Sequence, residues 1–397
     1  MDPEYPRPAT GRRASSVPPP RHGRAAFIHS AALESFSYPP GSPFSLERAA
    51  QTRAILASMG LLDGWASNEV APDAATRAEL TTFHDPVYLD AMLAAQDGTL
   101  HPRILEMGLG SSDCPIFKGM YDYAALAAGA SLTAARLILG GRADVAFNPS
   151  GGFHHAGPGY ASGFCYVNDI VLACLELTKA GRRVATLDID VHHGDGTQNA
   201  FYDRSDVLTI SLHESGEFLF PGTGFVDEIG EGDGRGYCVN MPFPPKTCDE
   251  PYLRAFSEVV IPLLAAYAPD VIVLEVGMDA LGGDPLAHLD LTNNAHAHVV
   301  DRVMQLGRPV LMTGGGGYQV RNTARGWALA WSVAIGIDSG DVAIAGLGGV
   351  MLENTDWAAG LRDRSFIPAP STRDAVDAQV RKTIESVKKL VFPFHGI

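Results

Sequence analysis

Residues 184–195 read VATLDIDVHHGD, a short apolar run that ends in a cluster of aspartates and histidines. The run Val184–Asp190 is continuous and partly β-branched, which is typical of a strand buried in a parallel sheet. Residues two apart share a face of an extended strand, so Asp190 and His192 are predicted to point the same way, with Asp188 beside them. Functional side chains collect at the carboxyl ends of parallel strands, so this segment indicates both the fold and the position of a site.

Four other short apolar runs have the same character, and helical spacing fills the intervals between them. The alternation predicts an α/β fold: one domain over residues 26–397, with a single parallel sheet and helices on both faces. Arg373–Val391 has the spacing of an amphipathic helix that packs on this domain, or alternatively contacts a second subunit. The remaining predicted strands are Ala143–Phe147, Val207–Leu212, Val271–Val276 and Pro309–Thr313, and the predicted helices are Tyr166–Lys179, Leu253–Tyr267 and Thr323–Ile335.

The composition narrows the class of protein. The chain has 397 residues, of which 46% are hydrophobic and 19% charged, enough apolar material for a large core. This excludes a disordered chain, a disulfide-stabilised mini-protein and a collagen-like polymer. The net charge of −15, from 45 acidic and 30 basic residues, argues against nucleic-acid binding through phosphate neutralisation. Small substrates or basic partners suit such a charge better.

Cysteine usage and the chain start indicate a cytoplasmic protein. The five cysteines form no C-x-x-C pair, so neither a disulfide framework nor a thiolate zinc site is indicated. No apolar run approaches the roughly 20 residues that span a bilayer. Residues 1–25 are rich in Pro and Arg and lack the apolar core of a secretory signal, and they predict a disordered tail.

Two further strand ends supply chemical groups for the same edge of the sheet. Gly277-Met278-Asp279 follows a predicted strand, and with Asp190 and His192 it could form an open site for Zn²⁺ or Fe²⁺. Gly151-Gly152-Phe153-His154-His155 follows another strand and could supply a general base and an electrostatic partner. Asp188 and Asp195 could orient these two imidazoles. Taken alone, a D-x-H segment is more often a hydrogen-bonding cluster, and a His pair is more often surface decoration.

Residues 313–318 read TGGGGY, after a strand and before a helix. A dinucleotide-binding G-x-G-x-x-G motif fails at its last glycine, where Gln319 stands. The glycines instead allow close backbone approach and place Tyr318 over the sheet edge. A phenol there can donate a hydrogen bond to a carbonyl oxygen and stabilise an oxyanion. The alternative is that Tyr318 only fills the core.

Five segments in order resemble the motifs of the histone deacetylase superfamily, most closely its bacterial acetoin-utilisation deacetylase-like branch. They are GGFHHAGPGYASGFCYVND, LDIDVHHGDGTQ, ISLHESGEFLFPGTG, VGMDALGGDPLAHLDLT and TGGGGYQVRNTARGW. The resemblance covers residues 26–335 and implies an arginase/deacetylase-like fold. It also implies hydrolysis of N6-acyl-lysine, chiefly N6-acetyl-lysine, by a water that a Zn²⁺ or Fe²⁺ ion activates.

The resemblance implies a role for each matching residue. Asp190, His192 and Asp279 would bind the metal. His155, oriented by Asp195, would act as general base and then general acid, while His154, paired with Asp188, would assist electrostatically and Tyr318 would polarise the scissile carbonyl. Gly163, Phe164 and Phe220 would wall the tunnel for the acyl-lysine, with Asp113 at the rim, Leu286 at the position of a polyamine gatekeeper and Arg48 at an internal acetate-exit channel. One structural potassium ion would be held by Asp188, Asp190, His192, Ser211 and Leu212, and a second by carbonyls of Phe201, Arg204, Val207 and Tyr237.

The chain departs from the family pattern at a few positions. Gly41-Ser42-Pro43 stands in place of Gly-His-Pro, and Glu275, Met278 and Ala280 replace the more usual Gln, Ala or Phe, and Ser. No catalytic or metal position is lost. Leu286 is not acidic, which favours acyl-lysine substrates over acetylpolyamines. The sequence does not indicate whether acyl groups longer than acetyl are also accepted.

Two other classes also remain: an arginase-type ureohydrolase, which needs two metal ions, and a non-catalytic binding protein. The expected partner is an acylated lysine peptide, an acylated protein or a small acylated amine, without nucleic acid or membrane. The sequence does not indicate whether the protein forms a homo-oligomer.

Overall fold

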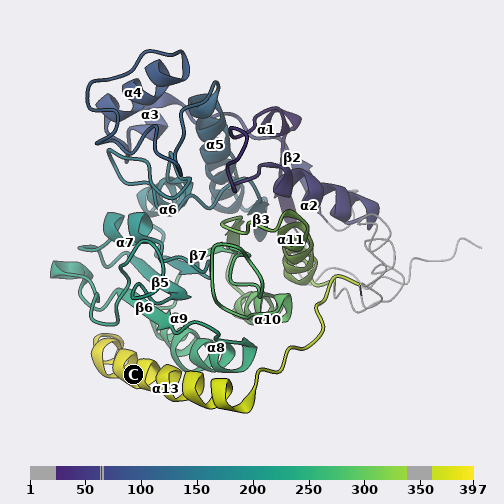
Figure 1. The fold of residues 1–397 in the computed structure, drawn as a ribbon, viewed down its shortest axis with the longest axis vertical. Helices are drawn as coiled ribbons and strands as arrows, with labels where there is room; N and C mark the ends of the chain where they lie inside the picture. Colours follow the sequence, from purple (N-terminus) through teal and green to yellow (C-terminus); the bar gives the residue numbers. More distant parts are fainter. Residues whose placement is uncertain (1–23, 63, 65–66, 338–359) are drawn as a thin grey trace, which may run out of the picture.

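The computed structural model describes residues 24–62, 64, 67–337 and 360–397. Its centre is one eight-stranded sheet with the order β2-β1-β3-β8-β7-β4-β5-β6, and each adjacent pair is parallel (Figure 1). This confirms the predicted fold class. The strands are β1 (Ala25–Ile28), β2 (Asn68–Val70), β3 (Val145–Asn148), β4 (Val184–Asp188), β5 (Val207–Glu214), β6 (Cys238–Phe243), β7 (Val271–Glu275) and β8 (Val310–Thr313).

All five predicted strands exist and lie next to one another in the sheet, while the three that were not predicted lie toward its two edges. β2 has the sequence NEV and is largely exposed, so it carries no apolar signal. β6 contains an asparagine and a proline, residues that are depleted in strands. Of the tail predicted over residues 1–25, residues 1–23 lie outside the described part of the chain, and Ala25 already belongs to β1.

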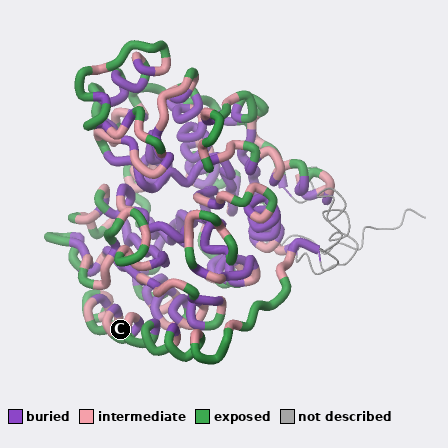
Figure 2. Tube along the Cα trace, in the orientation of Figure 1, coloured by how far each residue is buried: buried purple, intermediate pink, exposed green. Residues whose placement is uncertain are grey.

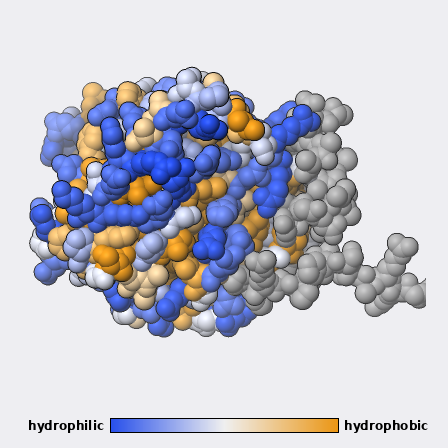
Figure 3. Space-filling model, turned by 90° about the horizontal axis from the view of Figure 1, so that it is seen from below, coloured by the Kyte–Doolittle hydropathy of each residue, from blue (hydrophilic) through white to orange (hydrophobic). Residues whose placement is uncertain are grey.

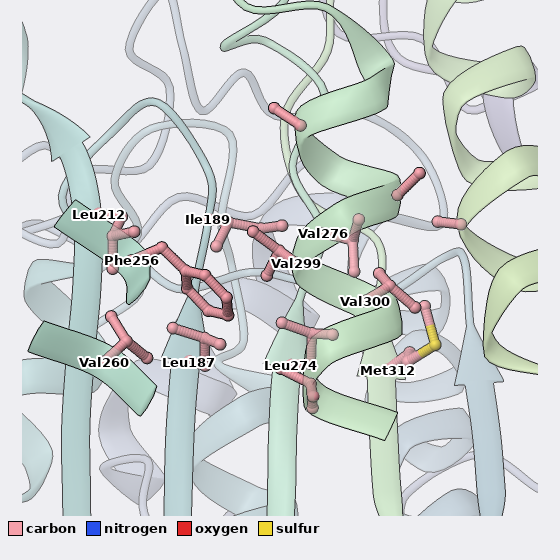
Figure 4. Packing of buried hydrophobic residues seen from close by; sticks show 14 of the residues in the cluster. Leu187, Ile189, Leu212, Phe256, Val260, Leu274, Val276, Val299, Val300 and Met312 are labelled. Carbon is pink, nitrogen blue, oxygen red and sulfur yellow. The ribbon is translucent and has the colours of Figure 1, made fainter. Parts of the chain in front are cut away.

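Alternation along the strands divides the core between the two faces of the sheet. Leu187 and Leu274 pack on one face under α2 (Glu47–Ser58), α10 (Asn293–Met304), α11 (Val320–Ala334) and the helices before β7. Phe256 and Val260 of the turn η2 (Phe256–Val260) contact this face (Figure 4). Strand neighbours such as Val273 point to the other face, under α5 (Met120–Leu139) and α6 (Asp169–Lys179). The remaining helices within the described residues are α1 (Ala31–Glu34), α3 (Arg77–Leu80), α4 (Pro86–Gln96), α7 (Asp195–Ala200), η1 (Gly232–Gly234), α8 (Asp249–Ala255), α9 (Ile261–Tyr267) and α13 (Pro370–His395).

The predicted helices are all present, with shifted ends. The helix expected over Tyr166–Lys179 begins only at Asp169, because Asn168 caps it through a hydrogen bond from the N–H of Val171. The helix expected over Leu253–Tyr267 starts earlier, at Asp249, and contains the wider turn η2 before α9. The helix expected over Thr323–Ile335 starts at Val320, immediately after the glycine run and Tyr318.

The C-terminal helix α13 packs on the domain, as its spacing predicted. Its inner side is buried against β6 and α8 (Figures 1 and 2). It thereby covers the edge of the sheet that β6 would otherwise expose, a common way to prevent strand pairing between molecules. The buried residues are Val376, Val380, Ile384, Val387 and Val391.

The surface view from below shows mostly hydrophilic side chains with small hydrophobic areas between them (Figure 3). In the part of the chain that the structure describes, no helix is both long enough and apolar enough to cross a bilayer.

Candidate active site

The segment that follows β4 is a loop rather than a continued strand. β4 ends at Asp188, two residues before the predicted end, because the Asp188 carboxylate accepts the N–H of Asp190 at 3.0 Å. The Asp190 carboxylate in turn accepts the N–H of His192 at 2.9 Å. Each aspartate therefore closes a tight turn onto the residue two positions on. The prediction that Asp190 and His192 lie together is confirmed, but the cause is these turns and not strand alternation.

Three groups from two strand ends form a candidate metal centre. Nδ1 of His192 lies 3.2 Å from Oδ1 of Asp190 and 3.0 Å from Oδ2 of Asp279. Ligand atoms of a tetrahedral zinc site with bonds of about 2.0 Å are about 3.3 Å apart, so these distances suit three atoms that share one ion. The other oxygens are engaged by the protein: the N–H of Gly316 donates to Oδ2 of Asp190 at 2.6 Å, and the N–H of Val191 to Oδ1 of Asp279 at 3.0 Å.

The charges at this centre also fit a cation. Asp190 and Asp279 are almost fully buried, and two adjacent carboxylates out of water require a positive charge nearby. Burial and the charge of Asp190 raise the pKa of Asp279 to about 7. Burial opposes the charged form of His192, but hydrogen bonds to the two carboxylates raise its pKa to about 10. In the metal-free protein, protons on these groups thus supply the positive charge that a bound divalent ion would supply.

The adjacent histidines lie beside this centre and each has an orienting carboxylate, as predicted. Nδ1 of His154 lies 2.8 Å from Asp188, and Nδ1 of His155 lies 2.7 Å from Asp195. The two Nε2 atoms are 3.0 Å apart, and the ring of His155 is 5.9 Å from that of His192. The pair therefore presents its inner ring nitrogens to one another, next to the candidate metal ligands.

The two imidazoles differ in charge because their surroundings differ. Burial and the positive charge of His154 lower the pKa of His155 to about 4, so that His155 is neutral at neutral pH and can accept a proton. Burial disfavours the charged form of His154, but two neighbouring carboxylates raise its pKa well above the usual range. One of these is Asp188, and the other is Glu275, whose Oε2 lies 3.2 Å from His154 Nδ1.

Glu275 was noted in the sequence only as a departure from the family pattern. It is the last residue of β7 and pairs with Asp188 of β4, which places a second buried carboxylate against His154. Glu275, His154 and Asp190 also form a second group of possible metal ligands whose donor atoms lie within 4.8 Å of one another. The register between β4 and β7, which the sequence does not reveal, places Glu275 beside Asp188, the carboxylate that His154 contacts.

Tyr318 stands at the end of the glycine run and faces the metal centre. Its ring centroid lies 6.4 Å from that of His192 and 5.6 Å from that of Phe164. Burial and the charges of Asp279 and Asp190 raise its pKa well above the usual range, so that the hydroxyl stays protonated and can act as a donor.

Gly316 is needed because the metal ligands leave no room for a side chain. A Cβ on Gly316 would overlap with the carboxylate of Asp279 and lie 2.9 Å from that of Asp190. We expect Gly316→Ala to weaken metal affinity at least about tenfold, as displaced support of a ligand does elsewhere. Calorimetric zinc titration of the metal-free protein would measure this.

Gly159→Ala is the matched control, because its Cβ would approach nothing closer than 4.0 Å. Equal zinc affinity of the two variants would contradict this account of Gly316.

Three of the predicted substrate residues, Gly163, Phe164 and Phe220, lie next to the histidine pair or Tyr318. Gly163 and Phe164 both adopt positive φ, at 51° and 66°, and the N–H of Gly163 donates to Asp113 at 2.9 Å. Phe220 is 46% exposed, and its ring lies 5.0 Å from that of His155. Leu286 packs against the apolar cluster that also contacts Tyr318. Gly163 and Phe220 therefore lie next to His155, and Phe164 lies next to Tyr318, while Leu286 is placed only by its membership of the same apolar cluster as Tyr318.

Arg48 lies behind the glycine run. Its buried guanidinium donates to the carbonyls of Gly315 at 2.8 Å and Gly317 at 3.1 Å and stacks over the Phe44 ring at 4.3 Å. It also lines a small pocket together with residues such as Tyr123, and Phe164 and Phe220 do not line this pocket.

The residues predicted to hold potassium lie around the ends of β4, β5 and β6. The Ser211 hydroxyl belongs to the residue that pairs with Asp188 in the sheet, and it contacts Nδ1 of His213 at 2.8 Å. For the second set, the carbonyl of Phe201 accepts the N–H of Arg204 at 3.1 Å and that of Tyr237 accepts the N–H of Thr209 at 2.9 Å. Both potassium sites stay predictions.

The chain is similar to known proteins over most of its length. Residues 42–334 match the model of the histone deacetylase domain. Histone deacetylase 2 of Oryza sativa subsp. japonica is 39% identical over 79% of this chain and 62% of its own length. Histone deacetylase RPD3 of Saccharomyces cerevisiae is 38% identical over 79% of this chain and 72% of its own length. The chain therefore spans less than two thirds of the rice relative.

A solved structure of similar shape supports the comparison. The crystal structure of an HDAC homolog from Aquifex aeolicus superposes with a TM-score of 0.83 and 29% identity, covering 92% of this chain and all of that one. An HDAC homolog complexed with SAHA gives the same values. The placement in the acetoin-utilisation branch stays a prediction. From its matched domain, its relatives and its fold, the chain belongs to the histone deacetylase family.

Proposed function

We propose that this protein is a metal-dependent amide hydrolase that removes acetyl groups from N6-acetyl-lysine. The observation that carries the proposal is the convergence of a carboxylate-oriented His155, the Tyr318 ring and a three-ligand candidate metal centre at one edge of the sheet. Family membership and the similarity to an HDAC homolog complexed with SAHA support the same function.

Asp190, His192 and Asp279 would hold the ion, Zn²⁺ or Fe²⁺. When bound, such an ion would act as a Lewis acid and lower the pKa of water. His155 is neutral and takes the proton from the attacking water, while Asp195 holds its far nitrogen. The Tyr318 hydroxyl donates to the carbonyl oxygen and continues to do so as that oxygen becomes negative. His155 then returns the proton to the leaving amine, and the charged His154 stabilises the same region.

The remaining residues would bind the substrate and structural ions. Gly163, Phe164, Phe220 and Leu286 would enclose the acyl-lysine stem, Asp113 would contact the substrate at the rim, and Arg48 would line an exit for acetate. Two potassium ions would occupy the sites predicted above. The five cysteines are free and buried, which fits a reducing cytoplasm, and the net charge of −15 fits basic, acylated partners.

The substrate class can be tested with the protein reconstituted with one equivalent of Zn²⁺ or Fe²⁺. We expect hydrolysis of an acetyl-lysine peptide with kcat/KM at least about tenfold above that for acetylspermidine, because the apolar Leu286 offers no charge to a polyamine. A longer-acyl peptide in parallel measures the depth of the tunnel. The proposal fails if none of the three amides is cleaved by protein with stoichiometric metal. Activity that needs two Mn²⁺ ions and acts on guanidino compounds would instead favour a ureohydrolase.

A further inference from the structure

The backbone that carries Tyr318 cannot hold its own shape. Four consecutive glycines precede the tyrosine, and Gly315 and Gly317 adopt φ values of 147° and 130° that other residues rarely reach. Glycine has the largest conformational freedom of any residue, so this run would sample many conformations in isolation. A tyrosine that must place its hydroxyl on a carbonyl oxygen therefore needs external support for its backbone.

Side chains from distant segments supply this support. Arg48 binds the carbonyls of Gly315 and Gly317, and Asp190 accepts the N–H of Gly316. These contacts fix the glycines but stop one residue short of the tyrosine.

Asp284 makes the contact to Tyr318 itself. Its Oδ2 accepts the backbone N–H of Tyr318 at 2.8 Å, and its Oδ1 accepts the backbone N–H of Leu286 at 3.0 Å. The neighbouring carbonyl of Gly283 accepts a hydrogen bond from the Gln319 side chain at 2.7 Å. One carboxylate thus joins the segment that carries the tyrosine to the segment that carries Leu286, a predicted substrate residue.

The segment Leu281–Leu291, here called the rim loop, is itself anchored at both ends. Its first and last residues form a β-bridge. The buried carboxylate of Glu214, at the end of β5, accepts the N–H of His288 at 2.8 Å and contacts its Nδ1 at 2.8 Å. These contacts restrain the rim loop, so that Asp284 can hold the backbone of Tyr318 in a defined position.

We propose that Asp284 is a positioning residue for Tyr318: its carboxylate fixes the backbone of the tyrosine relative to that of Leu286, a predicted substrate residue. This inference rests on the proposed function and deepens it. In that function the orientation of the catalytic hydroxyl would depend on the rim loop, which carries a predicted substrate residue. A misplacement of about 1 Å in an active site can cost about 100-fold in rate.

Asp284→Asn keeps one acceptor of the two, and Asp284→Ala removes both. With an acetyl-lysine peptide, we expect kcat to fall several-fold in the first variant and roughly 10- to 100-fold in the second, with KM changed less than about threefold. Metal content should stay at the wild-type value, since Asp284 is not among the candidate ligands. Asp290→Asn is the matched control on the same loop. The Asp290 carboxylate lies 3.4 Å from Lys246 Nζ, a weak exposed ion pair, so we expect this substitution to leave kcat within about twofold.

A double-mutant cycle separates positioning from a general structural effect. In a Tyr318→Phe background, Asp284→Ala should reduce kcat by less than about threefold, because the hydroxyl that it positions is already gone. Hydrogen exchange of the peptide that covers residues 314–319 gives a readout that needs no activity, and Asp284→Ala should accelerate exchange of the Tyr318 amide at least about tenfold.

The inference is overturned if Asp284→Ala lowers kcat equally in both backgrounds, or if it leaves the exchange of the Tyr318 amide unchanged. If wild-type protein cleaves no acetyl-lysine peptide, the proposed function fails, while the exchange experiment still decides whether Asp284 holds the tyrosine.

Discussion

Replacement of His192 with alanine is expected to lower kcat/KM for an acetyl-lysine peptide by about four orders of magnitude or more. His192 is the only imidazole of the candidate metal centre Asp190–His192–Asp279, and it contacts both carboxylates. Without His192, only two buried carboxylates would be left to hold the ion. A protein that does not hold the ion loses its effect on water, whose pKa a bound ion lowers from about 16 to about 7. The measurement is the steady-state rate together with metal content by mass spectrometry.

His298→Ala is the control for this experiment, since His298 is an exposed histidine on α10. It should retain full activity and metal. A His192→Ala protein that keeps both its metal and more than about a tenth of the wild-type rate would show that the ion binds elsewhere.

Tyr318→Phe is expected to lower kcat by two to three orders of magnitude, which corresponds to the roughly 3–4 kcal/mol that one donor to an oxyanion contributes. KM should change little, because the ring and its contact with Phe164 remain. Metal content and melting temperature should match the wild type, since only a hydroxyl is removed and the backbone contact to Asp284 persists.

Tyr121→Phe is the matched control. It removes the hydroxyl of a half-buried tyrosine on α5 that lies outside the candidate site. If Tyr318→Phe turned over substrate as fast as this control, the tyrosine would have no role in stabilising the oxyanion.

Much of the site was predictable because its residues lie in compact segments at strand ends. Asp190, His192 and Asp279 follow two strands whose apolar sequence is unmistakable, and parallel strands bring their carboxyl ends to one edge. The detailed reason given for the pairing of Asp190 and His192 was wrong, since the turns that join them depend on side-chain hydrogen bonds that strand periodicity does not describe.

Other features depend on contacts that no local pattern encodes. Glu275 lies against His154 because the register of β4 with β7 places it beside Asp188, which His154 also contacts. Asp284 acts on a backbone N–H 34 positions further along the chain, and a hydrogen bond to the main chain leaves no signature in the partner's residue type. The edge strand β2 is short and polar, so its place in the sheet is decided by pairing with β1 rather than by its own sequence.

The central claim is that one ion is shared by Asp190, His192 and Asp279. The most direct measurement is anomalous X-ray diffraction from crystals of the protein reconstituted with Zn²⁺, recorded on both sides of the zinc absorption edge. We expect a single zinc peak per chain, in contact with Nδ1 of His192 and with both carboxylates. A peak bound instead by His154 and Glu275, or two peaks of equal height, would contradict this assignment.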